Sequence, residues 1–209
     1  AEARERGFEV FDATCPLVTK VHVEVAKLRR EGYDFIMIGH KGHPEVEGTM
    51  GQLTEGIHLV EEPADVAGVQ VPDESRIAVV TQTTLSVDDA AEILRAVKQR
   101  FPLVREPKKQ DICYATQNRQ DAVKVLSGEV DIVIVVGSPT SSNSNRLREV
   151  AQWLGTASYM VDSADEIRAD WFEDRPRVGL TAGASAPELL VDAVIARLKE
   201  LGALSVRKM

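Results

Sequence analysis

Short apolar runs alternate with longer segments of helical periodicity along most of the chain. Continuous apolar runs of this length, rich in β-branched residues, are typical of strands that a sheet buries on both faces. The predicted strands lie at 8–11, 35–38, 57–60, 77–80, 132–136, 158–161 and 177–180. The predicted amphipathic helices lie at 16–31, 45–53, 87–100, 116–127, 144–154 and 187–201. This alternation predicts an α/β fold in which helices cover mostly parallel sheets.

The stretch 102–110 separates two similar halves of this pattern. Its sequence, PLVREPKKQ, contains two prolines and a group of cations, which is typical of a connection between domains. We therefore predict two α/β domains, 8–104 and 105–204, each a mostly parallel sheet covered by helices. The tract SPTSSNSN at 138–145 follows the most apolar predicted strand, and we interpret it as a loop from a strand into a helix.

The composition fits a globular protein and excludes several classes of partner. Of the 209 residues, 44% are hydrophobic, which suffices for a buried core, and the formal net charge is −8. An acidic chain is a poor match for nucleic acid or for an anionic membrane surface, so we expect neither as a partner. No apolar run approaches the roughly 18 residues of a membrane span, and the charged start AEARERG differs from a signal peptide. We expect a cytoplasmic protein.

The chain has two cysteines, Cys15 and Cys113. Two cysteines are too few for a disulfide scaffold, and by themselves they do not complete a four-ligand zinc or iron–sulfur site. Taken singly, each fits a buried apolar thiol. Each also stands just before a predicted helix, where reactive and metal-binding thiols occur. The residues themselves leave both interpretations open.

Polar residues gather where predicted strands lead into predicted helices. They are Cys15 before Pro16, His43 before Pro44, Ser86 with Asp89, the group Ser141, Ser142 and Asn143, and Ser185 with Glu188. Each of them alone fits an ordinary helix start or cap. In an open parallel sheet, however, such loops lie at the carboxyl edge, where ligands bind and helix N-termini attract anions. Because several of these helix starts are rich in hydroxyls and have no nearby Lys or Arg, we expect an anion such as phosphate to be held mainly by neutral donors. The sequence contains no Walker motif and no G-x-G-x-x-G, so we do not expect a nucleotide bound in the usual ways.

The segment HKGHPEVE at 40–47 contains two histidines three positions apart and two glutamates. This spacing does not match H-E-x-x-H, which makes a zinc site the weaker interpretation. His43 and Glu45 are better candidates for general acid–base chemistry, because a helix start in a cleft tunes both of their pKa values.

Six strings, in this order and at this spacing, resemble a single enzyme family. They are DATCPLVTKVH, GHPEVEGTMGQ, TQTTLSVDD, DICYATQNRQ, SSNSNRL and TAGASAPE. The family is 4-hydroxy-3-methylbut-2-enyl diphosphate reductase, the iron–sulfur oxidoreductase that ends the methylerythritol phosphate pathway of isoprenoid biosynthesis. The resemblance implies three α/β domains around a central [4Fe-4S] cluster. It also implies reductive dehydroxylation of the diphosphate substrate to isopentenyl diphosphate and dimethylallyl diphosphate.

The resemblance further implies roles for individual residues. Cys15 and Cys113 match the second and third of three cysteine ligands of the cluster. Glu45 matches the proton-delivering glutamate, His43 a substrate-contacting histidine and Thr83 a threonine near the substrate hydroxyl. The residues that match the diphosphate grip are Ser141, Ser142, Asn143 and Ser185. The electron donor that the family implies is a ferredoxin or a flavodoxin.

The family pattern begins with a domain that supplies the first cysteine and two more histidines, and it ends with a C-terminal tail. None of these elements matches the 209 residues of this sequence. We therefore expect the chain to be the second and third domains alone, with a cluster that two of three thiolates hold weakly or lose. The alternative interpretation is a non-catalytic α/β module that binds a small phosphorylated ligand or a partner protein and has structural cysteines.

Overall fold

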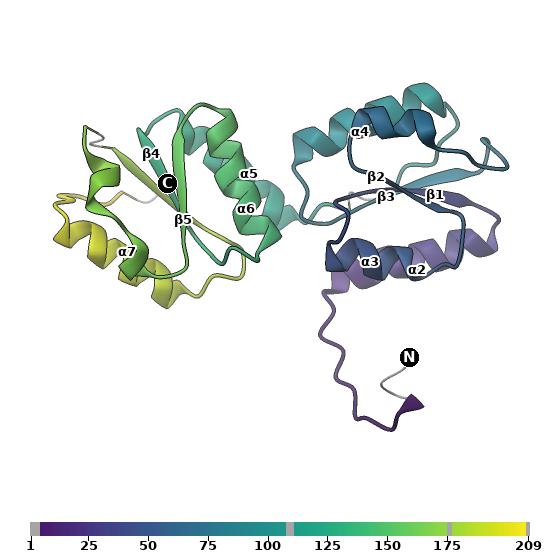
Figure 1. The fold of residues 1–209 in the computed structure, drawn as a ribbon, viewed down its shortest axis with the longest axis horizontal. Coiled ribbons are helices and arrows are strands. Elements are labelled where there is room, and N and C mark those ends of the chain that lie inside the picture. Colours follow the sequence, from purple (N-terminus) through teal and green to yellow (C-terminus); the bar gives the residue numbers. More distant parts are fainter. Residues whose placement is uncertain (1–4, 108–110, 175–176, 208–209) are drawn as a thin grey trace. The chain divides into compact units, whose positions relative to one another are not determined.

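A computed structural model describes residues 5–107, 111–174 and 177–207, and the chain divides into two compact units (Figure 1). The first unit comprises Ala1–Thr83 and Glu92–Asp111, and the second comprises Thr84–Ala91 and Ile112–Met209. The chain therefore enters the second unit at Thr84, returns to the first at Glu92 and leaves it again after Asp111. The predicted domain ranges, 8–104 and 105–204, stay a prediction.

The first unit is built on a three-stranded parallel sheet with the order β2-β1-β3. Its elements are α2 (Pro16–Arg30), β1 (Asp34–Ile38), α3 (Pro44–Met50), β2 (Ile57–Val60), the 3-10 helix η1 (Pro63–Gly68), β3 (Ile77–Thr81) and most of α4 (Val87–Arg100). The central strand β1 is buried along its whole length and pairs Phe35 with Ile57 on one side and with Ala78 on the other. Apolar residues of α2 and α3 pack with Phe35 and Met37 on one face of the sheet.

The second unit repeats this plan with the order β5-β4-β6, again entirely parallel. Its elements are α5 (Tyr114–Ser127), β4 (Ile132–Val136), α6 (Ser142–Trp153), β5 (Ala157–Val161), the 3-10 helices η2 (Ala164–Glu166) and η3 (Ala169–Phe172), β6 (Val178–Ala182) and α7 (Glu188–Glu200). The central strand β4 is fully buried. Its Val133 and Val135 pack against α5 and α6, whereas its alternate residues pack against α7 on the other face.

Each unit places one helix before its central strand and another directly after it. Helices α2 and α5 lead into β1 and β4, and helices α3 and α6 follow the carboxyl ends of those strands. Because the strands of each sheet are parallel, the loops after its first and third strands lie at the same edge of that sheet. The predicted fold of parallel, helix-covered sheets is confirmed, and it brings the polar strand-to-helix junctions of each unit to one edge.

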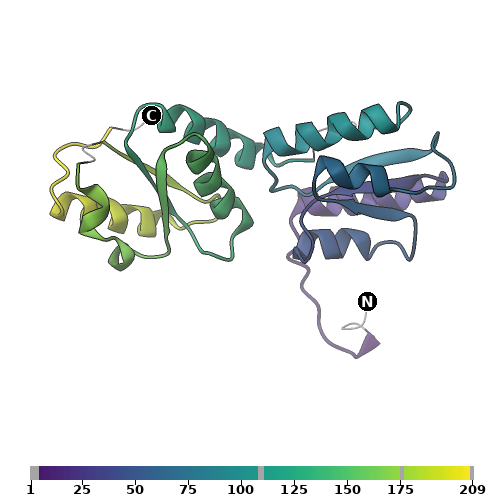
Figure 2. The same cartoon turned by 45° about the horizontal axis from the view of Figure 1, so that its top comes forward.

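The first predicted strand, at 8–11, is wrong. These residues are assigned to neither helix nor strand, and Phe8 and Phe11 are 60% and 85% exposed. The run FEVF favours an extended backbone, but a strand also needs a neighbouring strand to pair its N–H and C=O groups. None of the strands in the described residues pairs with this segment, which Figure 2 shows as an extended trace leading into α2.

Three helices, α3, α5 and α6, begin one or two residues earlier than predicted. None of the described helices is long and apolar enough to cross a membrane. Helix α5 begins at Tyr114 and helix α6 at Ser142, each two residues before the predicted start. In both cases the helix begins directly after its N-cap, Cys113 or Ser141, whereas the apolar periodicity becomes visible only one turn later.

Candidate functional site

Helix α3 begins with the residues that the HKGHPEVE segment singles out. Strand β1 ends at Ile38, and the chain turns into α3 with His43 as N-cap and Pro44 at the first helical position. Proline suits that position because its φ is already helical and its missing N–H would have no partner there. Gly39 lets the helix approach the strand end, since a Cβ on it would lie 2.6 Å from Cγ2 of Val46.

The imidazole of His43 is a hydrogen-bond acceptor at this helix start. Its Nδ1 accepts the backbone N–H of Glu45 at 3.2 Å. Burial, and to a lesser extent the neighbouring His40, lower the pKa of His43 below its ordinary value. The ring is therefore favoured in its neutral form, with Nε2–H as its donor.

Glu45 and Thr83 form a hydrogen-bonded pair between the start of α3 and the loop after β3. Oε1 of Glu45 accepts the backbone N–H of Thr83 at 2.6 Å, and the Thr83 hydroxyl donates to Oε2 at 3.0 Å. Burial raises the pKa of Glu45, the two hydrogen bonds from Thr83 oppose this rise, and the Asp111 carboxylate adds to it. The resulting pKa lies above that of an ordinary glutamate, as in carboxyl groups that donate protons.

Asp111 is a buried acid that the sequence pattern did not single out. Its Oδ1 lies 2.8 Å from Nζ of Lys20 in α2, and its Oδ2 accepts the N–H of Thr81 at 3.2 Å. Burial raises the pKa of Asp111, and the ion pair with Lys20 opposes that rise. Asp111 therefore links α2 to the end of β3 within the first unit. Asp111 is the first residue of the string DICYATQNRQ, but the string does not reveal its contact with Lys20, which lies 91 positions earlier.

Cys15 and Cys113 occupy the same place in the two units. Each is the N-cap of the helix that leads into the central strand of its unit, and neither thiol makes a capping hydrogen bond to the described residues. Both are free thiols; Cys15 is exposed and Cys113 is half-buried. The interpretation as a buried core thiol is therefore wrong for Cys15.

The two thiols have the donor chemistry of an iron–sulfur site, whose protein ligands are thiolates. Among residues 5–107, 111–174 and 177–207, no group of three or more His, Cys, Asp or Glu side chains is arranged to hold a metal ion. The HKGHPEVE segment thus gives no support to the zinc interpretation. The cysteines fit as two ligands of a cluster, and the described residues do not complete the ligand set.

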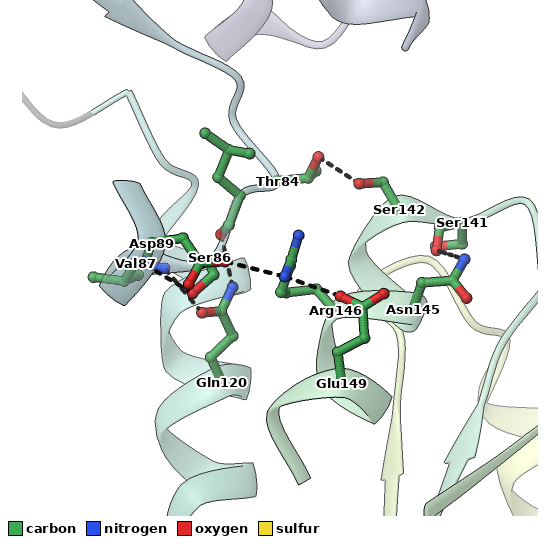
Figure 3. A network of polar contacts seen from close by, with 11 residues as sticks. Thr84, Ser86, Val87, Asp89, Gln120, Ser141, Ser142, Asn145, Arg146 and Glu149 are labelled. Carbon is green, nitrogen blue, oxygen red and sulfur yellow. Dashed lines mark hydrogen bonds and ion pairs between the residues drawn. The ribbon is translucent and has the colours of Figure 1, made fainter. Parts of the chain in front are cut away.

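Helix α6 begins with neutral groups and has no acid in its first turn. Ser141 is the N-cap, and its Oγ accepts the N–H of Ser144 at 3.3 Å. The hydroxyl oxygens of Ser142 and Thr84 lie 3.0 Å apart (Figure 3). Without a carboxylate in the first turn, the positive end of the helix dipole is left for an anion from outside the helix.

Asn143, the second residue of α6, is buried without a partner. It is 8% exposed, and neither its Oδ1 nor its Nδ2 has a hydrogen-bond partner in the described part of the chain. Its Nδ2 lies 3.6 Å from the place that a Cβ on Gly183 would take, so the amide faces the loop after β6. A buried polar group left unpaired costs roughly 1–3 kcal/mol. The arrangement therefore points to a ligand as the missing partner.

The two predicted capping boxes have different outcomes. Oγ of Ser86 accepts the N–H of Asp89 at 3.2 Å, as predicted for a cap. Helix α7 instead has Pro187 as its N-cap, so the prediction that Ser185 caps it is wrong. Ser185 is an exposed residue of the loop after β6, the loop that the Asn143 amide faces.

Each unit thus collects part of the predicted site. The first unit brings together His43, Glu45 and Thr83. The second unit brings Ser141, Ser142 and Asn143 to one helix start and places the loop of Ser185 next to it. Cys15 lies in the first unit and Cys113 in the second.

Comparisons with known proteins agree on one family. Residues 1–199 match the family described as LytB protein. Over 208 residues the chain is 77% identical to the 4-hydroxy-3-methylbut-2-enyl diphosphate reductase of a Polaromonas species and 76% identical to that of Methylibium petroleiphilum. These alignments cover 100% of this chain and 62% and 63% of the two relatives.

A solved structure is also similar. It is the E-1-hydroxy-2-methyl-but-2-enyl-4-diphosphate reductase from Plasmodium falciparum, with a TM-score of 0.92 and 35% identity. The match covers 97% of this chain and 64% of that one. The chain therefore spans less than two thirds of the length of each of these three relatives.

Proposed function

Because the chain belongs to the LytB protein family, we propose that it forms part of a 4-hydroxy-3-methylbut-2-enyl diphosphate reductase. Such an enzyme uses two electrons and two protons to remove the allylic hydroxyl of (E)-4-hydroxy-3-methylbut-2-enyl diphosphate as water. The products are isopentenyl diphosphate and dimethylallyl diphosphate. One observation carries the proposal: the Glu45 carboxyl group has a raised pKa, and both of its oxygens accept hydrogen bonds from Thr83.

Glu45 would deliver the proton with which the hydroxyl leaves. A carboxyl group with a raised pKa keeps its proton to higher pH than an exposed glutamate and can then donate it to a leaving oxygen. Protonation on Oε2 would reverse the hydrogen bond to Thr83 and turn the Thr83 hydroxyl hydrogen toward the substrate. Nε2–H of His43 would donate a hydrogen bond to the leaving hydroxyl oxygen of the substrate and hold that oxygen in place.

The start of α6 would bind the diphosphate. The helix N-terminus without an acid, the hydroxyls of Ser141 and Ser142 and the unpaired Asn143 amide are neutral donors for phosphate oxygens. Ser185, from the loop that Asn143 faces, would add a further hydroxyl. This set agrees with an anion site that needs no lysine or arginine in direct contact.

Cys15 and Cys113 would be two ligands of a [4Fe-4S] cluster. When bound, that cluster supplies the electrons and a Lewis-acidic iron for the substrate oxygen. The family pattern requires a third thiolate, for which this sequence has no cysteine. With two thiolates, this chain alone is expected to hold a cluster weakly and to have low activity. We further propose a ferredoxin or flavodoxin as electron donor and the cytoplasm as location.

A second candidate function is a non-catalytic module that binds a phosphorylated ligand or a partner protein. The absence of a three-ligand metal group from the described residues favours it. Both candidate functions use the anion site at the start of α6, so a measurement of phosphate binding does not distinguish them. A measurement of iron uptake does.

Anaerobic reconstitution with iron and sulfide tests the choice. We expect the full-length protein that contains this chain to take up iron, to develop the broad visible absorption of a cubane cluster and to reduce the diphosphate substrate. The 209-residue chain, treated in the same way, should retain less iron after desalting. A full-length protein that takes up no iron would contradict the reductase and favour the binding module.

A further inference from the structure

The loop after β3 is fastened to helices of the second unit by several side chains (Figure 3). We name residues 84–89 the strap. The strap belongs to the second unit, although the strand that precedes it belongs to the first. The side chains that contact the strap are Gln120 and Lys124 of α5 and Ser142 and Arg146 of α6.

Gln120 makes the most buried of these contacts. It is 1% exposed; its Nε2 donates to the carbonyl oxygen of Leu85 at 2.8 Å, and its Oε1 accepts the N–H of Val87 at 3.2 Å. Val87 is the first residue of α4, where a backbone N–H has no partner within the helix. One side-chain amide thus pairs a carbonyl and an N–H of the strap.

Arg146 holds the far end of the strap. Its Nη1 lies 3.3 Å from Oδ2 of Asp89 and 2.9 Å from Oε2 of Glu149. Arg146 comes from α6, the helix whose start carries Ser142. The strap is therefore held by α5 near its middle and by α6 at its end.

Thr84 is the strap residue beside the proposed anion site. Its Oγ1 lies 3.0 Å from Oγ of Ser142. Gln120 binds the carbonyl of the next residue, Leu85, so this contact determines where the Thr84 backbone lies and where its hydroxyl can reach. Either hydroxyl can donate in this contact; when the Thr84 hydroxyl donates, the Ser142 hydroxyl becomes a stronger donor to a phosphate oxygen.

We propose that Gln120 is a positioning residue for anion binding. It fixes the backbone of the strap, the strap holds the Thr84 hydroxyl on Ser142, and Thr84 orients the Ser142 hydroxyl toward a phosphate oxygen. The inference rests on the proposed function, because it takes the start of α6 as the diphosphate site. It adds a residue that lies outside that site and acts on it through the strap.

A double-mutant cycle with inorganic pyrophosphate as the probe tests the role of Gln120. The variants are Gln120→Leu, Thr84→Val and the double variant, and binding to this chain is followed by NMR titration. If Gln120 acts through Thr84, each single change raises Kd by about five- to tenfold and the double change raises it no further, because the effects of residues coupled through one backbone segment are not additive. If the two effects multiply, Gln120 does not act through Thr84 and the inference is wrong.

Thr156→Val is the matched control. The buried Thr156 hydroxyl donates to the carbonyl of Ser127 at 3.1 Å, in the same unit but away from the strap. We expect this variant to lower the temperature of unfolding, as Gln120→Leu does, and to leave Kd for pyrophosphate unchanged. If it raises Kd as much as Gln120→Leu, the effect is a general loosening of the unit and contradicts the positioning role.

Failure of the inference and failure of the proposed function give different results. If the unmodified chain does not bind pyrophosphate, the proposed anion site is wrong and the positioning role falls with it. If the unmodified chain binds and Gln120→Leu binds equally well, only the positioning role is wrong. Should Gln120→Leu fail to fold, Gln120→Glu takes its place, because it keeps the acceptor for Val87 and removes the donor to Leu85.

Discussion

The two units use one backbone position for different chemistry. In each, the helix that follows the central strand has a polar side chain at its second residue, Glu45 in α3 and Asn143 in α6. Glu45 receives two hydrogen bonds from Thr83 in the loop after β3. Asn143 faces Gly183 in the corresponding loop after β6, and its amide has no partner among the described residues.

The opposite loop explains this difference. A threonine can supply both an N–H and a hydroxyl to a carboxyl group, which is thereby held in place with its proton. A glycine supplies no side chain, so the amide keeps its hydrogen-bonding capacity for a ligand. The first turns of the two helices also differ in charge: the first turn of α3 carries Glu45 and Glu47, whereas that of α6 carries no acid. In the proposed function, one scaffold would therefore present a proton donor in one unit and an anion site in the other.

The largest expected effect tests whether the two cysteines, one in each unit, have the same role. Cys15 and Cys113 are both N-caps of the helices that lead into the central strands, so we expect Cys15→Ser and Cys113→Ser to weaken iron binding alike in the full-length protein. Loss of a ligand should exceed the roughly 10- to 100-fold loss of metal affinity that outer-shell changes cause. Iron content and visible absorption after reconstitution are the measurements. An unchanged absorption band in Cys113→Ser would refute ligation by that thiol.

The next effect concerns Glu45, the proposed proton donor of the first unit. In the proposed full-length reductase, Glu45→Gln should lower kcat by about 100- to 10,000-fold, the range typical of a general acid, and leave KM nearly unchanged. Steady-state turnover of the diphosphate substrate measures both. Glu47→Gln, an exposed position two residues further along α3, is the control and should retain activity. Near-normal turnover in Glu45→Gln would eliminate the proton-donor role.

The corresponding change in the second unit should separate stability from binding. Asn143→Leu removes two buried polar atoms without partners, so we expect the free energy of unfolding to rise by about 1 kcal/mol. The same change should raise Kd for inorganic pyrophosphate about tenfold, the equivalent of one lost hydrogen bond to a charged group. Chemical denaturation and NMR titration measure the two effects.

Asn145→Leu provides the contrast for stability. Its Nδ2 donates to the carbonyls of Pro139 at 2.7 Å and Ser141 at 3.1 Å, so the free energy of unfolding should fall by about 1–2 kcal/mol. If Asn143→Leu is destabilised as strongly as Asn145→Leu, the Asn143 amide has a partner within the protein, and the contrast between the two units fails.

Local signals in the sequence account for most of the fold. The run IVIVV becomes the fully buried strand β4, and prolines at the starts of α2 and α3 mark the helix positions that proline prefers. The prediction at 8–11 is wrong because a strand also depends on a neighbour that no local pattern reveals. Ser185 matches a capping motif, but Pro187 takes the N-cap position of α7.

Buried polar residues show where sequence reasoning ends. Asp111 pairs with Lys20, 91 positions earlier, and Gln120 binds Leu85, 35 positions earlier. Both residues stand at the ends of the string DICYATQNRQ, but that string does not show which distant segments they contact, because their burial follows from the way those segments fold together. His43, Glu45 and Asn143 were accessible to prediction since each stands at a strand-to-helix junction, although their roles stay a prediction.

The smallest expected effect is a pH dependence of stability, which we expect for the change at Glu45 in the first unit and not for the change at Asn143 in the second. Because the folded-state pKa of Glu45 is raised, the folded chain binds this proton more tightly than the unfolded chain does. The stability that the neutral carboxyl contributes is present below the unfolded pKa of about 4.3 and is lost as pH rises through the folded pKa. As the pH rises through this window, the free energy of unfolding of the wild type should therefore fall relative to that of Glu45→Gln. The difference in free energy of unfolding between Asn143→Leu and the wild type should be the same at each pH. Denaturation across the window measures both, and a wild type that gains stability relative to Glu45→Gln would mean that the fold favours the carboxylate.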